Sequence, residues 1–339
     1  MDTQEFPSKQ ELAIALSPRA LKLMILPTEQ CNFRCVYCYQ DFQDGKMQPK
    51  LVEGIKRLID RRMEDITYIA LSWFGGEPLV AKDIVFEIAE HVDRRCREHG
   101  VTHSRGVMTT NGYLLTPSVM ERLTKANQTY FQISLDGLGE THNLSRPLMS
   151  GKGSFDTLWN NLLQLRQSDY DFEIELRLHF GGCELTETEA LCREINRQFG
   201  GDKRFTVYVK CIENYGGPNS DKITPLAREI AEQTSEHLLT LLPDLVTSHM
   251  YQKQMREICY AAHPNNLLIR ADGRIGKCAL ALKDPCNTIG HLDGDGRLHI
   301  DNERFKPWIA GFKELDEELL TCPYNGIANT PAPQVITFS

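Results

Sequence analysis

Strand-like and helical segments alternate regularly between residues 21 and 212. The runs typical of strands are Leu21–Leu26, Ile66–Phe74, Gly106–Thr110, Thr129–Leu135, Phe172–Phe180 and Phe205–Ile212. Segments typical of helices begin at Pro49 and cover Asp83–His99, Pro117–Lys125, Phe155–Gln167 and Thr186–Phe199. Strands that alternate with helices pair in parallel through right-handed crossovers. The pattern therefore predicts an α/β fold on a parallel sheet, and it leaves open whether that sheet is open or a barrel.

Three cysteines gather in the loop after the first strand. Cys31, Cys35 and Cys38 have the spacing C-x3-C-x2-C. Thiolates are the usual ligands of iron-sulfur clusters, and a four-iron cluster on three cysteines keeps one iron open to chelate a small molecule. Zinc with a distant fourth ligand and a disulfide are the alternatives. Zinc motifs usually come as C-x2-C pairs, and the sequence has no second such pair, which favours iron.

The same loop resembles the signature of the radical S-adenosylmethionine (SAM) superfamily, which places an aromatic residue, here Tyr37, before the last cysteine. The resemblance implies a [4Fe-4S] cluster on Cys31, Cys35 and Cys38, with SAM on the open iron. Reductive cleavage of SAM would give a 5'-deoxyadenosyl radical that abstracts a hydrogen atom. An external donor such as flavodoxin or ferredoxin would supply the electron. The resemblance also implies a partial (βα)6 TIM-like barrel.

A second motif follows the second predicted strand. Gly75, Gly76, Glu77 and Pro78 resemble the family's GGEP motif, in which the backbone and the Glu hold the amino group of SAM. Two glycines let a backbone approach a ligand closely, and a carboxylate accepts from an ammonium. The motif stands where chemistry gathers in parallel α/β folds, at the carboxyl end of a strand.

Further candidate residues follow the next strands. Asn111 lies in a segment that resembles the family's TNG motif near the methionine part of SAM, and Ser134 stands where the family contacts the SAM ribose or carboxylate. Arg146 and Arg177 are candidate carboxylate partners, with an ordinary ion pair as the equal alternative. Asp136 is a candidate catalytic base or a turn residue, and the turn is slightly favoured.

The last third of the sequence departs from the repeating pattern. Asn266–Arg270 and Ile275–Cys278 flank a turn and predict a β-hairpin. The spacing of Cys259, Gly273 and Cys278 resembles the opening of the SPASM/twitch extension, which binds auxiliary [4Fe-4S] clusters. The full SPASM pattern needs further cysteines that are missing here, so we expect one auxiliary cluster.

Cys322 is the natural third ligand of that auxiliary cluster. The fourth ligand is open between Cys286, His263, a carboxylate and none, and structural zinc is the alternative for the whole site. Two other cysteines follow predicted strands: Cys211 and Cys183 are candidate donors of a hydrogen atom to a substrate radical, with simple burial as the alternative.

Composition limits the partners. With 41% hydrophobic and 25% charged residues among 339, the protein is able to form a large core. A net charge of -8 disfavours a nucleic-acid partner. The sequence shows neither an apolar run of the ~20 residues that span a membrane nor a signal peptide, so we expect no membrane association and a cytoplasmic protein. In that compartment the eleven cysteines favour cofactors over disulfides.

These observations give an expected organisation and function. We expect an N-terminal extension (1–20), a radical SAM partial barrel (21–242), and a connector with a twitch/SPASM-like auxiliary domain (243–339). The resemblance implies a peptide maturase that abstracts hydrogen from a ribosomally made precursor peptide and crosslinks its side chains through a C-C or C-S bond. The alternatives are a peptide L-to-D epimerase with Cys211 as hydrogen donor and a small-molecule dehydrogenase with one auxiliary cluster. The dehydrogenase alternative stays open because residues 1–20 are too short for a leader-binding domain.

Overall fold

The computed structural model describes residues 6–181, 183–247 and 257–328. Within these ranges one mixed sheet has the strand order β12-β11-β10-β9-β1-β2-β4-β5-β6-β7-β8, with β3 beside β2. The strands from β1 to β8 pair in parallel. They are β1 (Ala20–Ile25), β2 (Tyr68–Trp73), β3 (Thr102–His103), β4 (Gly106–Thr110), β5 (Gln128–Leu135), β6 (Glu173–Phe180), β7 (Phe205–Cys211) and β8 (Val246–Thr247). The predicted α/β fold is confirmed.

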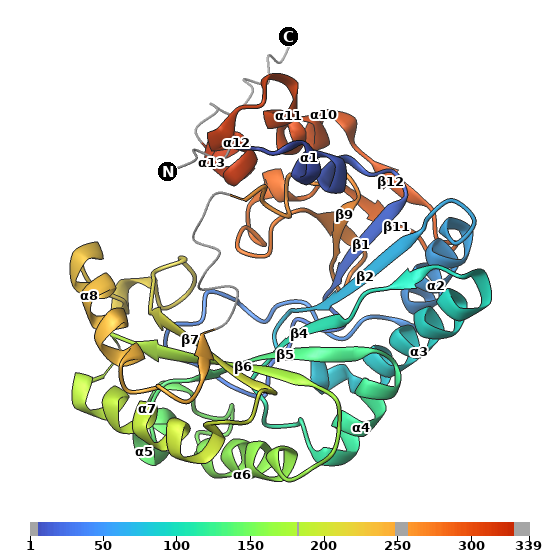
Figure 1. The fold of residues 1–339 in the computed structure, drawn as a ribbon. Helices are drawn as coiled ribbons and strands as arrows, with labels where there is room; N and C mark the ends of the chain where they lie inside the picture. Colours follow the sequence, from blue (N-terminus) through green and yellow to red (C-terminus); the bar gives the residue numbers. More distant parts are fainter. Residues whose placement is uncertain (1–5, 182, 248–256, 329–339) are drawn as a thin grey trace.

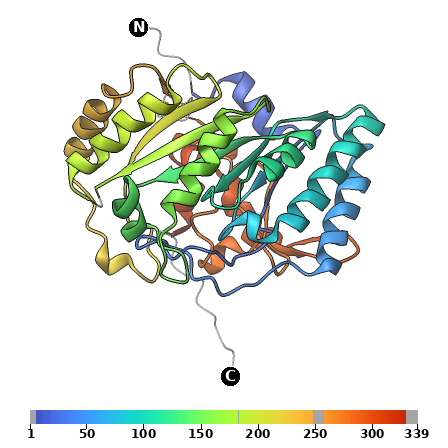
Figure 2. The ribbon, with the colours of Figure 1, turned by 90° about the horizontal axis from the view of Figure 1, so that it is seen from below.

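Helices cover the outer side of this curved sheet, and its concave side stays open to the interior (Figure 1). They are α2 (Pro49–Arg62), α3 (Lys82–His99), α4 (Pro117–Lys125), α5 (Gly139–Ser145), α6 (Phe155–Arg166), α7 (Leu185–Phe199) and α8 (Arg228–Leu239), with short 3-10 turns η1 (Pro78–Ala81) and η2 (Ser220–Lys222). Figure 2, seen from below, shows the helices lying in front of the strands. All five helices expected between the strands are confirmed: α2 begins at the predicted Pro49, and the ends of the other four lie within one residue of the predicted ones.

The ends of these helices follow local chemistry. Thr116 caps α4 by accepting a hydrogen bond from the backbone of Val119, and Pro117 occupies the first helical position. At the other end of α3, Gly100 adopts a left-handed conformation (φ 68°) that ends the helix. Such signals are local, which is why the sequence located these helices well.

The C-terminal segment extends the same sheet. Strand β9 (Asn266–Ile269) pairs in parallel with β1, with Asn266 opposite Lys22. Strand β10 (Arg274–Gly276) then returns antiparallel to β9, so the predicted hairpin is confirmed. The remaining elements are β11 (Gly290–Leu292), β12 (Leu298–Ile300), η3 (Pro285–Asn287), η4 (Lys306–Ile309), α10 (Asn302–Phe305), α11 (Gly311–Glu314), α12 (Glu317–Thr321) and α13 (Pro323–Ala328). Side chains from this segment, such as Ile269 and Trp308, join the main hydrophobic core.

Some elements were not expected from the sequence. Helix α1 (Lys9–Leu16) begins at a capping box in which Ser8 and Glu11 bond to each other's backbone amides. A connector was expected over residues 245–257. Residues 248–256, which make up most of it, lie outside the residues that the structure describes. The predicted domain boundaries stay predictions.

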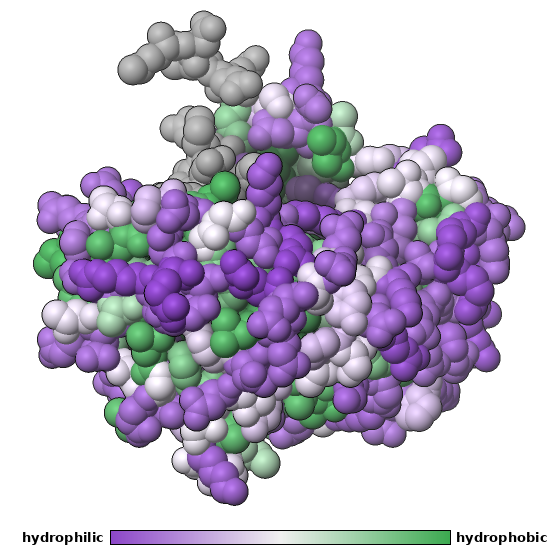
Figure 3. All heavy atoms as spheres, turned by 60° about the horizontal axis from the view of Figure 1, so that its bottom comes forward, coloured by the Kyte–Doolittle hydropathy of each residue, from purple (hydrophilic) through white to green (hydrophobic). Residues whose placement is uncertain are grey.

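The surface is mainly polar. Figure 3 shows one face on which hydrophilic side chains surround separate, smaller apolar areas. Among the helices that the structure describes, each is too short or too polar to cross a bilayer.

Candidate active site

A cavity of about 840 Å³ lies along the inner face of the sheet. Cys31, Cys35 and Cys38 all line it, so the structure brings the three cysteines to one space. The predicted cofactor residues that line the same cavity are Tyr37, Gly75, Gly76, Asn111, Ser134, Arg146 and Arg177. Cys211 lines it too, whereas Glu77 and Asp136 are buried behind its wall.

The cysteine loop is held by its own backbone and by the segment after α5. The amide of Phe33 donates to Cys31 Sγ at 3.3 Å, and Arg34 donates through Nη1 to the carbonyl of Cys31 at 2.8 Å. The backbone amides of Arg34 and Val36 donate to the carbonyls of Pro147 and Ser145. The loop is therefore ordered by contacts more than a hundred residues away in the sequence.

The thiols of this loop suit a metal cluster better than free cysteine chemistry. Burial raises the pKa of Cys31 to about 12 and that of Cys35 to about 11. Such thiols stay protonated near neutral pH unless a bound metal supplies positive charge. Three thiols that line one cavity with the spacing C-x3-C-x2-C fit an iron-sulfur cluster, for which thiolates are the usual ligands.

The two glycines after β2 are needed because the loop before Cys31 crosses them. A Cβ on Gly75 would lie 2.3 Å from the carbonyl oxygen of Thr28, and Gly75 also has φ 114°. A Cβ on Gly76 would lie 2.3 Å from the carbonyl oxygen of Gln30. Both glycines therefore fix the approach of the cysteine loop to the sheet, in addition to lining the cavity.

Glu77 ties the ends of β2 and β4 together. Its carboxylate accepts from the amide of Leu79 (3.0 Å), the hydroxyl of Thr110 (2.8 Å) and the amide of Asn111 (2.7 Å). Burial raises the pKa of Glu77, and these donors oppose that shift. Asn111 in turn donates to Asn32 Oδ1 at 2.8 Å, which connects this corner to the cysteine loop. The hydrogen-bond donors to Glu77 are all groups of the protein itself. The predicted contact of Glu77 with SAM stays a prediction.

A buried polar network lies beneath Tyr37. The phenol oxygen is 3.1 Å from Asp136 Oδ1 and 3.0 Å from His179 Nδ1, and Arg146 donates to it. His179 Nδ1 is also 3.2 Å from Asp136 Oδ1, and Ser145 donates to Oδ2 at 2.5 Å. The network therefore holds the side chain of Tyr37, which lies between Cys35 and Cys38 in the sequence.

Asp136 acts within this network as an ionised anchor. Burial alone would raise its pKa, but Arg146 and His179 outweigh burial and hold the pKa well below its ordinary value. A carboxylate so stabilised is a weak base. The structure thus favours a positioning role over the predicted catalytic role, and the turn interpretation missed the network. His179, which was not predicted from the sequence, shares the inner face of β6 with Arg177, two residues earlier; that period-2 signal could have found it.

Ser134 and Arg177 lie side by side on paired strands. They occupy the same register position on β5 and β6, and both line the cavity. The guanidinium of Arg177 lies 5.6 Å from the ring centroid of Tyr208, and its buried Nε has no hydrogen-bond partner among the described residues. Because Arg177 lines the cavity, its guanidinium can donate hydrogen bonds to a carboxylate ligand there. The predicted roles of both residues therefore stay predictions that the geometry allows.

The two candidate hydrogen donors differ in position. Cys211 ends β7 and lines the cavity, and a Cβ on Gly181 would lie 3.5 Å from its sulfur. Cys183 does not line the cavity; its sulfur lies 3.5 Å from Thr188 Oγ1 and 3.7 Å from the carbonyl of Asp136. Cys211 is therefore the better placed of the two.

The cysteines of the last third also gather. Cys259 is joined to the helix before Cys322 by a backbone bond to Leu320 (2.8 Å). Burial raises the pKa of Cys259 to about 11, and the charges of Cys278 and Cys322 add to that shift. Burial, Asp284 and then Cys278 raise the pKa of Cys286 to about 12. Cys286 therefore joins Cys259, Cys278 and Cys322 in one neighbourhood.

His263, the other residue named as a candidate fourth ligand, contacts a lysine on β1. Its Nδ1 lies 3.3 Å from the ammonium of Lys22 on β1. Burial and the charge of Lys22 lower the pKa of His263 to about 4. Of the two named candidates, Cys286 is the one that the fold brings beside Cys278.

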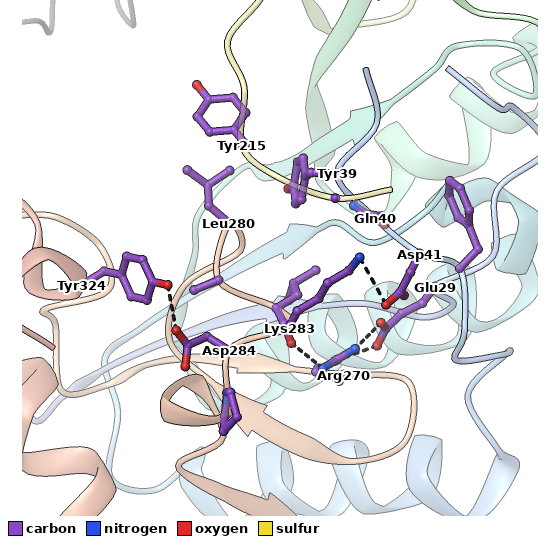
Figure 4. Close-up of a pocket in the computed structure, with 15 residues that line it drawn as sticks. Glu29, Tyr39, Gln40, Asp41, Tyr215, Arg270, Leu280, Lys283, Asp284 and Tyr324 are labelled. Carbon is purple, nitrogen blue, oxygen red and sulfur yellow. Dashed lines mark hydrogen bonds and ion pairs between the residues drawn. The ribbon is translucent and has the colours of Figure 1, made fainter. Parts of the chain in front are cut away.

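A second hollow of about 380 Å³ adjoins the main cavity (Figure 4). The two share the walls formed by Tyr39, Gln40, Phe42, Tyr215 and Leu280. Side chains at the base of the second hollow pair with each other: Arg270 with Glu29, Lys283 with Asp41 (3.5 Å) and Tyr324 with Asp284 (2.8 Å). The hollow therefore has a mainly aromatic and aliphatic upper wall and a polar floor whose charged side chains pair with each other.

A model of the Radical SAM superfamily matches residues 25–190. The AdoMet-dependent heme synthase of Methanosarcina barkeri is 30% identical over 217 residues, which cover 63% of this chain and 56% of that protein. The Fe-coproporphyrin III synthase of the same organism is 34% identical over 136 residues, 40% of this chain and 31% of that one. A serine-type anaerobic sulfatase-maturating enzyme of Klebsiella aerogenes is 27% identical over 179 residues, 50% and 44% respectively. The match thus spans between about a third and somewhat over half of each relative.

Solved structures share the fold over most of the protein. The structure of anSMEcpe with bound AdoMet and the Kp18Cys peptide has a TM-score of 0.63 at 17% identity and covers 90% of this chain and 88% of that one. The structure of Streptococcus suis SuiB bound to the precursor peptide SuiA has a TM-score of 0.57 at 15% identity, with 90% and 70% covered. At these identities the likeness concerns the fold.

Proposed function

Because this chain belongs to the radical SAM superfamily, we propose that it is a radical SAM enzyme that modifies peptides. Cys31, Cys35 and Cys38 would hold a [4Fe-4S] cluster with SAM on its open iron. When bound, these groups supply a 5'-deoxyadenosyl radical that takes a hydrogen atom from the substrate. Gly75, Gly76, Asn111, Ser134 and Arg177 are the cavity residues proposed to bind SAM.

One observation carries the proposal. All three thiols line a single cavity, and that cavity adjoins a second hollow whose lining includes Pro285, the neighbour of Cys286 in the sequence. One residue of a substrate peptide can occupy the first space while its neighbours in the same peptide occupy the second. The apolar wall formed by Tyr39, Tyr215 and Leu280 suits an aromatic or aliphatic neighbour.

The finer assignments are part of the proposal. The parallel strands β1, β2, β4, β5, β6 and β7 with their outer helices support a partial (βα)6 barrel. The β9–β10 hairpin, with Cys259 before it and Cys278 after it, supports a twitch/SPASM-like region. An auxiliary [4Fe-4S] cluster on Cys259, Cys278 and Cys322 would accept the second electron when a crosslink forms. Crosslinking removes two hydrogen atoms: the radical takes one, and the other leaves as a proton and an electron. A flavodoxin or ferredoxin would donate the first electron.

Peptide chemistry is supported by relatives and by fold. A sulfatase-maturating enzyme is among the similar proteins, and two structures of this fold contain peptides. A heme synthase is also similar, and the cavity volume of about 840 Å³ lies in the range of small-molecule sites. A small-molecule substrate is therefore the second candidate. Epimerisation is the nearest peptide variant, because Cys211 faces the cavity.

The test uses the full-length protein with its clusters reconstituted anaerobically, SAM and a chemical reductant. One probe is a pool of short synthetic peptides, and the other is Fe-coproporphyrin III. We expect peptides that lose two hydrogens, or that take up solvent deuterium without mass loss if epimerisation occurs. Deuterium uptake should then disappear in Cys211→Ala and persist in Cys192→Ala, whose thiol is buried on α7. Conversion of the porphyrin with all peptides unchanged would contradict the peptide proposal.

A further inference from the structure

His179 lies near the carboxyl end of β6, and its side chain lines the main cavity. Its ring stands edge-on to the ring of Tyr37, with the two centroids 5.6 Å apart. Its Nδ1 lies 3.2 Å from Asp136 Oδ1 and 3.0 Å from the hydroxyl oxygen of Tyr37. One ring nitrogen is therefore engaged by a buried acid and a phenol.

The second ring nitrogen, Nε2, is left to the cavity. Among the described residues, the hydrogen-bond partners of His179 all lie at Nδ1. The side chain is 12% exposed, and Nε2 is not among the enclosed polar atoms that lack a partner. Since the residue lines the main cavity, a molecule bound there can reach Nε2.

The hydrogen bonds around Nδ1 select one tautomer of the ring. Arg146 donates to the phenol oxygen of Tyr37, and the hydroxyl of Tyr37 donates to Asp136 Oδ1. An ionised Asp136 is an acceptor only, so the proton of the neutral ring belongs on Nδ1, where the carboxylate accepts it. The lone pair of the ring then lies on Nε2, the nitrogen that is open to the cavity.

The surroundings also keep the ring neutral near pH 7. Burial lowers the pKa of His179, and the hydrogen bond and charge of Asp136 oppose that shift. The positive charges of Arg177 and Arg146 add to the lowering of this pKa. A neutral imidazole that a carboxylate holds through one nitrogen is arranged to accept a proton at the other.

We propose that Nε2 of His179 is the base that accepts the proton which a peptide substrate loses when its crosslink closes. The inference rests on the proposed function. For a C-S crosslink, the 5'-deoxyadenosyl radical takes a hydrogen atom from a carbon atom, and the sulfur of a peptide cysteine bonds to that carbon. The S-H bond breaks, its proton goes to Nε2, and one electron goes to the auxiliary cluster. A thiol is acidic enough to lose its proton to an imidazole.

A structural role of His179, limited to holding Tyr37 and Asp136, predicts a different result. His179→Asn keeps an N–H donor near the position of Nδ1 and removes Nε2, so it separates the two roles. His237→Asn is the matched control. That histidine also pairs with a carboxylate, Glu189 at 2.7 Å, but it lies on α8 and does not line the cavity.

The first measurement needs no substrate. The side-chain nitrogens of full-length, cluster-free protein containing histidine labelled with nitrogen-15 are observed by NMR near neutral pH. The signals of His179 are identified by their loss in His179→Asn. We expect a protonated Nδ1 and an unprotonated Nε2. A proton on Nε2 would overturn the proposal, because this nitrogen could then accept none.

The second measurement compares product formation with SAM cleavage. Reconstituted full-length protein receives SAM, a chemical reductant and a pool of short synthetic peptides that contain cysteine. We expect His179→Asn to lower the amount of crosslinked peptide formed per 5'-deoxyadenosine about a hundredfold or more, which is the usual contribution of a general base. His237→Asn should give the parent ratio.

The outcomes are distinguishable from those of the proposed function. An unchanged ratio in His179→Asn would overturn the proposal, because loss of a structural or SAM-binding residue lowers product and 5'-deoxyadenosine together. A parent that cleaves SAM and modifies none of the peptides would refute the peptide substrate, and with it the proton donor named here. The NMR result for His179 is independent of that outcome. If His179→Asn does not fold, His179→Gln is used in both measurements.

Discussion

The hydroxyl of Tyr39 donates a hydrogen bond to the carbonyl oxygen of Ala279 at 3.1 Å. Tyr39 directly follows Cys38, and Ala279 directly follows Cys278. The amide of Ala279 donates at 2.9 Å to the hydroxyl of Tyr260, the neighbour of Cys259. Two tyrosines therefore hold the backbone beside Cys278 and join the two cysteine groups.

Tyr39→Phe should destabilise the protein by about 1–2 kcal/mol, because it leaves a carbonyl without its partner and keeps the ring. Urea unfolding of the cluster-free protein measures this change. Tyr215→Phe is the control, since that tyrosine is exposed and its ring also packs near Tyr39. Equal effects of the two substitutions would contradict a specific role for the bond to Ala279.

Gly76→Ala should cost about 1–3 kcal/mol, because the new Cβ would lie 2.3 Å from the carbonyl oxygen of Gln30. The displaced loop should also bind less iron at Cys31. Gly45→Ala provides the control, as its Cβ would meet nothing within 4 Å. Unfolding free energy and iron content are measured for both variants. If Gly76→Ala and Gly45→Ala have the same unfolding free energy and the same iron content, close packing of the cysteine loop does not require a glycine at position 76.

Arg146→Met should cost about 3 kcal/mol or more, because it leaves the buried carboxylate of Asp136 without its arginine partner. Adding Asp136→Asn should recover part of the loss, since the uncompensated charge is then gone. The exposed pair of Arg228 and Glu232 serves for comparison: Arg228→Met should change stability by less than about 1 kcal/mol. No recovery in the double variant would show that Asp136 and Arg146 are energetically independent.

His142 should make the protein less stable in acid. It is fully buried, and burial together with Arg146 lowers its pKa from 6.5 to about 4, although Asp136 opposes the shift. Because the unfolded protein binds a proton below about pH 6.5 and the folded protein does not, acidification favours unfolding.

The loss attributable to His142 between pH 7.5 and pH 5 should be about 2 kcal/mol. Urea unfolding at both pH values measures it, with His142→Asn showing a smaller dependence on pH than the parent. An identical pH dependence of parent and variant would rule out a neutral, buried His142.

Local signals made much of the fold predictable. The predicted ends of β4 and α4 agree with the structure, because Thr116, Pro117 and a period-2 or period-3.6 apolar pattern mark them. Helix α1 was missed because its buried contribution is limited to Ala15, although the Ser8–Glu11 capping box was readable.

The site was predictable where motifs follow strands and not where it depends on long-range contacts. The cavity position of Ser134 and Asn111 follows from their places at the ends of parallel strands. The contact of Tyr37 with His179 spans 142 residues, and β9 pairs with β1 at the opposite end of the sequence, with Asn266 opposite Lys22. No local pattern encodes such contacts, so they needed the folded protein.

Iron content together with SAM cleavage, measured anaerobically on the reconstituted protein and on the Cys31→Ala, Cys35→Ala, Cys38→Ala variant, decides whether the cysteine loop supports radical SAM chemistry. We expect about eight irons in the parent and about four in the variant, with 5'-deoxyadenosine formed by the parent alone. The buried Cys96→Ala variant should behave like the parent. Zinc in place of iron, or a parent that leaves SAM intact under reduction, would refute the radical mechanism.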